Sequence, residues 1–384
     1  MGSIIPIIEK ETSGRSFKSH KYCHDTKDYG GITYDDNTEI VWKAYGETEK
    51  HKQPINLKLQ ARARLKVPTI FSYFLDGSRH TYKVDDISYN NNVYPILAGQ
   101  VGVGCCERRG KVLKPALGFE RKIVIALPNK AFSTDGWNEK DKVKNLLIQL
   151  NKKMMTTCKI EINDLLIYST DKDESFDKKG IAKIQEYMVE SEKQIVAELV
   201  TRGRLDDNNY LIKDGSLDYQ KISENKDKRA LNLSEQHIAN YYQYVVGVSK
   251  SFDPTRCFVA GGGCNSNVIA NLKLYERTPA FRYTSTRAEV DFCIWYVRVR
   301  EACYTNNIFD GILKVEKLIV TQEEKENGID SDEIDNITAH LLNERNPVCY
   351  GTDARWANHL YPIYLTEKFI KSKYISNQMF MQLF

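Results

Sequence analysis

Residues 68–104 read PTIFSYFLDGSRHTYKVDDISYNNNVYPILAGQVGVG, and this stretch decides the fold class. It holds three runs of apolar and β-branched residues, separated by polar residues that are typical of tight turns. The pattern predicts three consecutive strands in an antiparallel meander. The first predicted strand ends at Asp76, and the Gly-Ser that follows predicts a sharp turn beside that carboxylate.

Strands and helices alternate along the rest of the chain. RKIVIALP at 121–128 predicts a strand, and helices are predicted over 138–154 and 177–202 with a strand between them. The second helix carries one apolar stripe at three- and four-residue intervals, formed by Ile181, Ile184, Met188, Ile195 and Leu199. Later segments predict strands that end at Asp214 and Lys250, a helix capped by Ser234, a strand in EVDFCIWYVRVRE, and a last helix beginning near Pro362. This order predicts an α/β fold with a mixed sheet flanked by helices.

Composition limits the class of protein. Of 384 residues, 41% are hydrophobic and 28% are charged, which is typical of a globular protein and excludes a disordered or fibrous one. The net charge of +4 is compatible with a polyanionic partner but does not require one. Nine cysteines without a CxxC pair predict neither a disulfide framework nor a zinc site, so we expect a reducing cytoplasm. No secretory signal or membrane span is predicted.

Residues 1–66 are polar and show no clear period, apart from a basic, helix-compatible stretch at NLKLQARARLKV. We expect them to form an N-terminal extension, with partner docking as a candidate role. Residues 67–384 are expected to form the main domain. The acidic stretch 321–336 is expected to be a solvated loop or a helix start.

The tripeptide Asp-Gly-Ser occurs twice, at 76–78 and at 214–216, each time after an apolar strand. Either copy alone could be only a turn. Two copies that end two strands suggest that Asp76 and Asp214 converge in a crevice at the sheet edge. Two carboxylates brought together repel each other unless a cation lies between them. The pair therefore predicts a site for a divalent metal ion.

A third carboxylate is expected from the helix over 177–202. Glu198 follows Ile195 by three residues and falls at the edge of the apolar stripe. A carboxylate near a buried helix face is costly unless it is paired or binds metal. The alternative is an ion pair with Arg202 on the surface. Glu190 and Glu192 are competing candidates on less favourable faces.

Basic and aromatic residues follow in the second half of the chain. Lys250 ends the run VVGVSK, where its ammonium could meet a phosphate or simply be solvated. The segment 355–374 interleaves basic and aromatic residues, which suits a strand that carries phosphates and unstacked bases. The residues expected to contact nucleic acid are Arg79, Lys250, Arg355, Lys368 and Lys371. His359 and Glu367 are both candidates to complete the metal site.

Several familiar motifs are absent. AGGGCNSN at 260–267 lacks the Lys-Ser/Thr of a phosphate-binding loop and the spacing of a dinucleotide fingerprint, so it predicts a turn. No G-x-S-x-G or H-E-x-x-H occurs, which argues against a serine hydrolase of that type and against a metalloprotease.

The ordered set FLDGSR, a helical glutamate, LIKDGSL, VVGVSK and NHLYPIYLTE resembles the NurA nuclease family, partners of the HerA hexameric ATPase. The resemblance covers roughly residues 65–375. It implies a ribonuclease H-like core, a homodimer, and Mg²⁺ or Mn²⁺ held by Asp76, Glu198 and Asp214. It also implies that Lys250 and Tyr361 belong to the site.

The family often carries a histidine on the helix after Tyr-Pro. This sequence has Glu367 there, and His359 precedes the Tyr-Pro pair, so either one is a candidate for that role. The expected activity is metal-dependent DNA cleavage beside a HerA-like ATPase, in DNA end processing or anti-phage defence. The alternatives are an inactive nucleic-acid-binding subunit of an ATPase complex and a phosphoesterase acting on small substrates.

Overall fold

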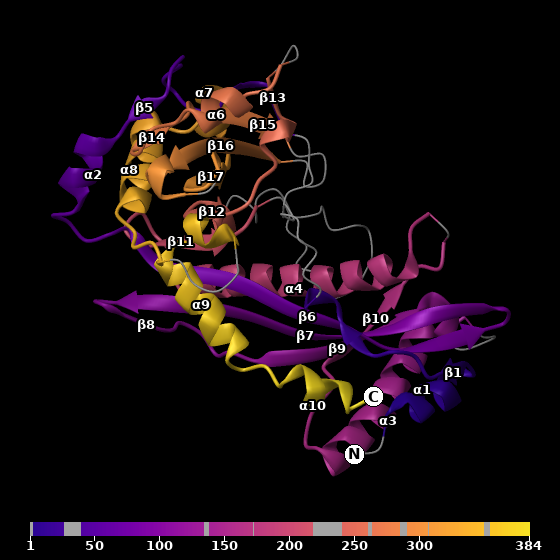
Figure 1. Cartoon of the computed structure of the whole chain (residues 1–384). Coiled ribbons are helices and arrows are strands. Elements are labelled where there is room, and N and C mark those ends of the chain that lie inside the picture. The colour runs from indigo at the N-terminus through magenta and orange to yellow at the C-terminus, as the bar shows by residue number, and fades with distance from the viewer. Residues whose placement is uncertain are drawn as a thin grey trace.

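A large mixed sheet organises the molecule, as a computed structural model shows (Figure 1). The structure describes residues 3–26, 40–133, 138–171, 173–217, 240–259, 263–284, 290–305, 307–348 and 354–384. Within them, one sheet has 15 strands. Its main path runs β10 (Asp164–Tyr168), β9 (Arg121–Pro128), β7 (Asn92–Arg109), β6 (Phe71–Tyr89), β11 (Tyr210–Asp214), β12 (Val245–Ser249), β17 (Ile312–Leu318), β16 (Asp291–Arg298), β14 (Glu276–Arg277) and β5 (Ile55–Asn56).

Shorter strands extend the edges of this path. They are β1 (Arg15–Phe17) and β2 (Tyr22–Cys23) on β6, β8 (Val112–Pro115) on β7, and β15 (Phe281–Thr284) on β16 with β4 (Ala44–Tyr45) beyond it. A separate pair joins β3 (Ile40–Trp42) to β13 (Cys257–Val259). The helices are α1 (Ile5–Thr12), α2 (Lys58–Arg64), α3 (Glu139–Thr157), α4 (Phe176–Thr201), α6 (Ser266–Ala270), α7 (Gln322–Asn327), α8 (Ser331–Leu342), α9 (Tyr361–Lys371) and α10 (Asn377–Met381).

The expected three-stranded meander over 68–104 is wrong in its strand count. One antiparallel ribbon of two long strands, β6 and β7, takes its place, with a bulge between Lys83 and Asp85. The first Asp-Gly-Ser does not turn, because Gly77 pairs with Val103 inside the ladder and has no positive φ. The ribbon reverses only near Asn90, whose φ is 55°. Asp76 therefore lies inside a strand rather than at its end.

The second Asp-Gly-Ser does turn. Asp214 is the last residue of β11, and Gly215 adopts a φ of +84°, which favours glycine. The strand β11 runs parallel to both β6 and β12, whereas β12 pairs antiparallel with β17. The predicted mixed α/β sheet flanked by helices is confirmed.

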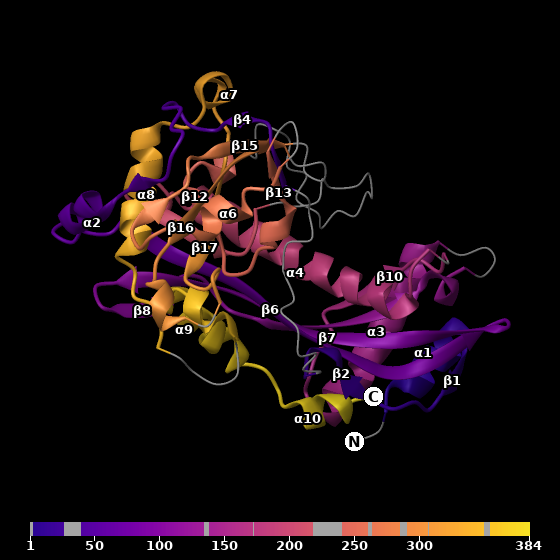
Figure 2. The ribbon, with the colours of Figure 1, turned by 45° about the horizontal axis from the view of Figure 1, so that its top comes forward.

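The helices α4 and α9 cover opposite faces of the β6–β7 ribbon (Figures 1 and 2). Glycines allow both to approach closely. A Cβ on Gly99 would lie 2.8 Å from Ile184 of α4, and one on Gly104 would lie 2.8 Å from Ile370 of α9. Because side chains alternate between faces along a strand, odd-numbered residues in the 99–104 stretch of β7 face α4 and even-numbered ones face α9. The same alternation decides which β6 residues can meet each helix.

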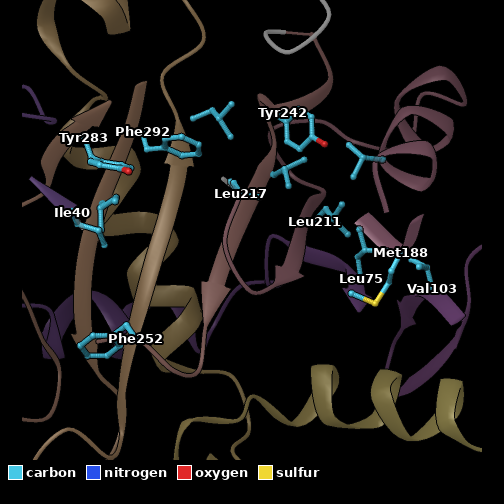
Figure 3. Packing of buried hydrophobic residues seen from close by; sticks show 14 of the residues in the cluster. Ile40, Leu75, Val103, Met188, Leu211, Leu217, Tyr242, Phe252, Tyr283 and Phe292 are labelled. Atoms are coloured by element: carbon cyan, nitrogen blue, oxygen red, sulfur yellow. The ribbon is translucent and has the colours of Figure 1, made fainter. Parts of the chain in front are cut away.

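The predicted helices over 138–154 and 177–202 are confirmed as α3 and α4, and the helix predicted near Pro362 is confirmed as α9. It is not the last helix, because α10 follows it. Ile184, Met188 and Leu199 of the α4 stripe are buried. Figure 3 shows Met188 against Leu75 and near Leu211, so α4 packs on the strands that carry both aspartates. The predicted helix capped by Ser234 lies outside the described residues.

The acidic stretch 321–336 folds as α7 and α8. A capping box between Thr321 and Glu324 starts α7, which confirms the expected helix start. Among the described residues the cysteines are free, and Cys293 is buried at 0% exposure.

The described part of the first 66 residues does not pack as a separate unit. Its strands join β6, β15, β14 and β13, and α2 packs against α8. The expected docking role of this segment stays a prediction. Within the described ranges, no helix combines the length and the apolar character that a membrane crossing requires.

Truncation of Ile184 tests the packing of α4. Ile184 is fully buried against Gly99, so we expect Ile184→Ala to lower the free energy of unfolding by about 2–5 kcal/mol in urea titrations. Ile148 of α3 is 53% exposed, and Ile148→Ala should change it by less than about 0.5 kcal/mol. Equal losses from both variants would contradict this account of the core.

Candidate active site

Three neighbouring strands place one polar residue each on the face covered by α9. Phe74, Ile212 and Val248 belong to one buried cluster on that face. Because the strand period is two residues, the residues two positions further are Asp76 on β6, Asp214 on β11 and Lys250 just after β12. A single hydrophobic layer thus aims two carboxylates and one ammonium in the same direction.

The two aspartates and Lys250 lie together and are largely buried. Asp76 is 5% exposed and Lys250 is 9% exposed. The Lys250 Nζ donates to Asp214 Oδ2 at 2.8 Å and lies 3.6 Å from Glu367 Oε2. The structure therefore brings together Asp76, Asp214, Lys250 and Glu367, four of the residues that the sequence indicated.

The C-terminal helix supplies the other side of the cluster. Glu367 projects from α9, where Lys371 also pairs with it. His359 precedes α9, is 2% exposed, and its Nε2 lies 3.8 Å from Glu367 Oε2. Tyr361 is at the helix start, 37% exposed, and stacks on Tyr364 at 6.1 Å. Both candidates for completing the site, His359 and Glu367, thus reach it, and Tyr361 lies two residues after His359 at the first position of α9.

The charges of the cluster shift its acidities in opposite directions. Burial, and then the charge of Asp214, raises the pKa of Asp76 well above its usual range. Burial also acts to raise the pKa of Asp214, but the charge and hydrogen bond of Lys250 outweigh it, so the pKa of Asp214 is lowered. The pKa of Glu367 is lowered too, because Lys250 and Lys371 together outweigh its burial. Asp76 is therefore the carboxylate whose charged form is disfavoured in the folded chain.

The expected position of Glu198 at the sheet is wrong. Its side chain is 44% exposed and pairs with Arg202, the surface alternative considered for it. Glu192 is the α4 carboxylate that reaches the sheet. It is 3% exposed and forms an ion pair of 3.1 Å with Lys213, the residue before Asp214. Six helical residues rotate by about 240° and rise by about 9 Å, so both glutamates cannot serve the same place.

Gly77 makes room for Glu192. A Cβ at position 77 would collide with the Glu192 carboxylate and lie 3.2 Å from Met188 Cγ. The glycine of the first Asp-Gly-Ser is therefore needed for close approach rather than for a turn. Burial raises the pKa of Glu192, opposed by the charge of Lys213. The sequence analysis named Glu192 only as a competing candidate on a less favourable face, although Glu192 lies four residues after Met188 on the apolar stripe.

The expected nucleic-acid contacts differ in how available their charges are. Arg79 donates to Gln185 at 2.6 Å, to Thr81 at 2.9 Å and to Asp25 at 3.1 Å. Lys368 and Lys371 are exposed on α9, with Lys368 Nζ 5.4 Å from the Tyr364 ring centre. The side chain of Arg355 lies outside the described residues.

The described residues contain no group of three or more His, Cys, Asp or Glu side chains arranged to hold a metal ion. What they offer is a pair of aspartates whose charges repel each other, with Lys250 as the neutralising cation. Mg²⁺ is commonly bound through one or two carboxylates, with water and substrate phosphate filling the remaining positions. The residues present fit that sparse kind of site and not a full protein cage.

Comparisons with known proteins add little to this geometry. No family model and no curated protein matches the chain. The chain is similar to the crystal structure of the NurA nuclease from Sulfolobus solfataricus, with a TM-score of 0.39 and 11% identity over 79% of this chain and 80% of that one. A similarity of this size carries no argument about activity, which rests on the cluster itself.

Gly77→Ala tests the contact between β6 and α4. The new methyl group should displace the Glu192 carboxylate from Lys213 and cost about 1–3 kcal/mol of unfolding free energy. The cost should shrink in a Glu192→Ala background, which a double-mutant cycle measures. Gly118 has open space around it, and Gly118→Ala is the matched control. If the stability losses of Gly77→Ala and Glu192→Ala simply add in the double variant, this explanation of Gly77 is wrong.

Asp76→Asn should stabilise the metal-free protein at pH 8. An unfolded aspartate titrates near pH 3.8, whereas burial and Asp214 raise the pKa of folded Asp76. Between the two values the folded chain holds a proton that the unfolded chain has lost. The contribution of Asp76 to stability therefore rises as the pH falls through its folded pKa. Above that pKa, Asp76 is charged in the folded chain and destabilises it by the full amount.

Thermal melts between pH 4 and pH 8 should show the gap between Asp76→Asn and the parent chain widening with pH. Asp207→Asn, on an exposed turn, should show no such trend. An Asp76→Asn protein less stable than the parent at pH 8 would contradict the assigned repulsion.

Proposed function

We propose that this protein is a metal-dependent nuclease that hydrolyses phosphodiester bonds of DNA, with Asp76 and Asp214 at its centre. The observation that carries the proposal is the convergence of two buried aspartates with Lys250, Glu367 and His359 on one sheet face. Two buried carboxylates that repel each other destabilise the folded chain, and such pairs are typical of sites that bind a cation.

Each residue has a role that its position supports. Asp76 and Asp214 would hold one or two Mg²⁺ or Mn²⁺ ions. Such ions lower the pKa of a bound water and neutralise charge on the leaving oxygen. Lys250, a cation already within 2.8 Å of Asp214, would pair with the phosphate and stabilise its transition-state charge. His359 and Glu367 lie where they can orient water or complete the shell.

The substrate and partners follow from the sequence resemblance and from the surface beside the site. Exposed Lys368 and Lys371, with Tyr361 and Tyr364 beside them, suit a strand with a phosphate backbone and unstacked bases. A homodimer that works with a HerA-like hexameric ATPase, in end processing or anti-phage defence, completes the proposal. Co-purification with such a hexamer, followed by cleavage assays with and without ATP, tests that part.

The second candidate function is an inactive nucleic-acid-binding subunit of an ATPase complex. The ion pair of Lys250 with Asp214 favours it, because this ammonium occupies a position where a metal ion would neutralise the same carboxylate. Degradation of linear DNA by the purified chain with Mn²⁺, stopped by a chelator, separates the two. Steep loss of binding with added salt would favour a long polyanion over a small phosphoester.

Removal of either aspartate should abolish cleavage. We expect Asp76→Asn and Asp214→Asn to lose DNA cleavage by about 10³-fold or more while retaining DNA binding in gel-shift assays, since the metal contribution is lost. Asp207→Asn should cleave like the parent chain. A variant at position 76 or 214 that cuts at the parental rate would refute the proposed site.

The two glutamates of α4 give a sharper comparison on one helix. Glu192 is buried beside Gly77 and Lys213, whereas Glu198 is exposed. We expect Glu192→Gln to lower the cleavage rate by about 10-fold or more, as is usual for groups that surround a metal site, and Glu198→Gln to leave it unchanged. A loss of cleavage in Glu198→Gln with none in Glu192→Gln would instead support Glu198 as the α4 carboxylate of the site.

A further inference from the structure

A buried carboxylate on β17 accepts hydrogen bonds from the turn that follows Asp214. Glu316 is 1% exposed, and its Oε2 accepts hydrogen bonds from the backbone N–H of Leu217 at 2.7 Å and from the Ser216 hydroxyl at 2.8 Å. Lys314, also 1% exposed, neutralises it at 2.6 Å. Burial of a charge is costly unless it is paired and hydrogen-bonded, and Glu316 meets both conditions.

This contact crosses an intervening strand. Gly247 of β12 is the register partner of Glu316 on one side and of Lys213 on the other. A Cβ on Gly247 would lie 2.8 Å from Leu217 Cγ and 3.1 Å from the Gly215 carbonyl oxygen. The missing side chain therefore lets the turn rest on β12 and lets Glu316 reach it.

The turn has further anchors on the same side. Lys213 Nζ donates to the carbonyl oxygens of Asp214 at 2.9 Å and Ser216 at 3.2 Å. Leu217 is fully buried and lies in the core cluster with Leu211 (Figure 3). Because Lys213 and Gly247 face away from α9, these anchors support the strand end from the face opposite the Asp214 carboxylate.

We propose that Glu316 and Ser216 are positioning residues that fix the Gly215–Leu217 turn and thereby aim the Asp214 carboxylate at Asp76 and Lys250. This inference rests on the proposed function and deepens it. The second Asp-Gly-Ser then uses all three residues: the aspartate for the site, the glycine for the turn, and the serine as the attachment point for β17. Displacing a reacting group by about 1 Å can cost about 100-fold in rate.

The test compares variants of Glu316 and Ser216, here called the clamp, with a matched carboxylate on α7 that pairs with a lysine of β17. Ser216→Ala removes one hydrogen bond, and Glu316→Gln removes the charge. Glu324 likewise accepts from two backbone N–H groups, of Val320 and Thr321, and pairs with a buried lysine. Glu324→Gln is therefore the control for the general cost of losing such a carboxylate.

We expect Ser216→Ala and Glu316→Gln to lower kcat for Mn²⁺-dependent DNA cleavage by about 10-fold or more, with KM for DNA unchanged. The Mn²⁺ concentration for half-maximal thermal stabilisation should rise in both, a readout that does not need activity. The double variant should lose less than the product of the single losses, because both act through one turn. Glu324→Gln should match the parent chain in kcat and in Mn²⁺ response.

Three outcomes would overturn the inference. Parental kcat and Mn²⁺ response in both clamp variants, with an active parent chain, removes the positioning role and leaves the proposed function standing. A loss in Glu324→Gln equal to that in the clamp variants shows general destabilisation. A parent chain that neither cleaves DNA nor responds to Mn²⁺ removes the proposed function and this inference together.

Discussion

The repulsion between Asp76 and Asp214 is the constraint on which the rest of the site depends. Both carboxylates sit where burial disfavours their charge, and the fold offsets this with Lys250 between Asp214 and Glu367. A lysine is a flexible, strongly hydrated cation that can move away when a better one arrives. The buried layer of Phe74, Ile212 and Val248 keeps the strands in register, so the repulsion cannot be relieved by spreading them.

Close approach of backbone and side chain recurs around this cluster, and glycine provides it each time. Gly77 admits Glu192 from α4, Gly104 admits Ile370 from α9, and Gly247 admits the turn that follows Asp214. Both faces of the sheet are thus used. The α9 face carries Asp76, Asp214 and Lys250, and the α4 face carries the ion pairs of Lys213 with Glu192 and of Lys314 with Glu316. The geometry of the proposed site and the packing around it depend on the same few positions.

Sequence patterns predicted the helices α3, α4 and α9, the mixed sheet, and the meeting of Asp76 with Asp214 and Lys250. These depended on period and on strand ends, which are local. Sequence patterns gave a wrong prediction for the first Asp-Gly-Ser, because Gly77 pairs with Val103 of β7 and stays extended instead of turning. They also failed on Glu198, since the edge of an apolar stripe does not reveal where a glycine leaves space. Glu316 and Lys314 could not be found from sequence, because their partner lies across β12.

The site is spread over most of the chain, from β6 to α9. On the ribosome, β6 and β11 emerge long before Glu367 and His359 do, and domains fold largely as units during synthesis. A nascent chain would hold the aspartates without the helix that covers them. The helix that covers these carboxylates, α9, is made after every strand of the described sheet, so the proposed site cannot be complete before α9 has been translated.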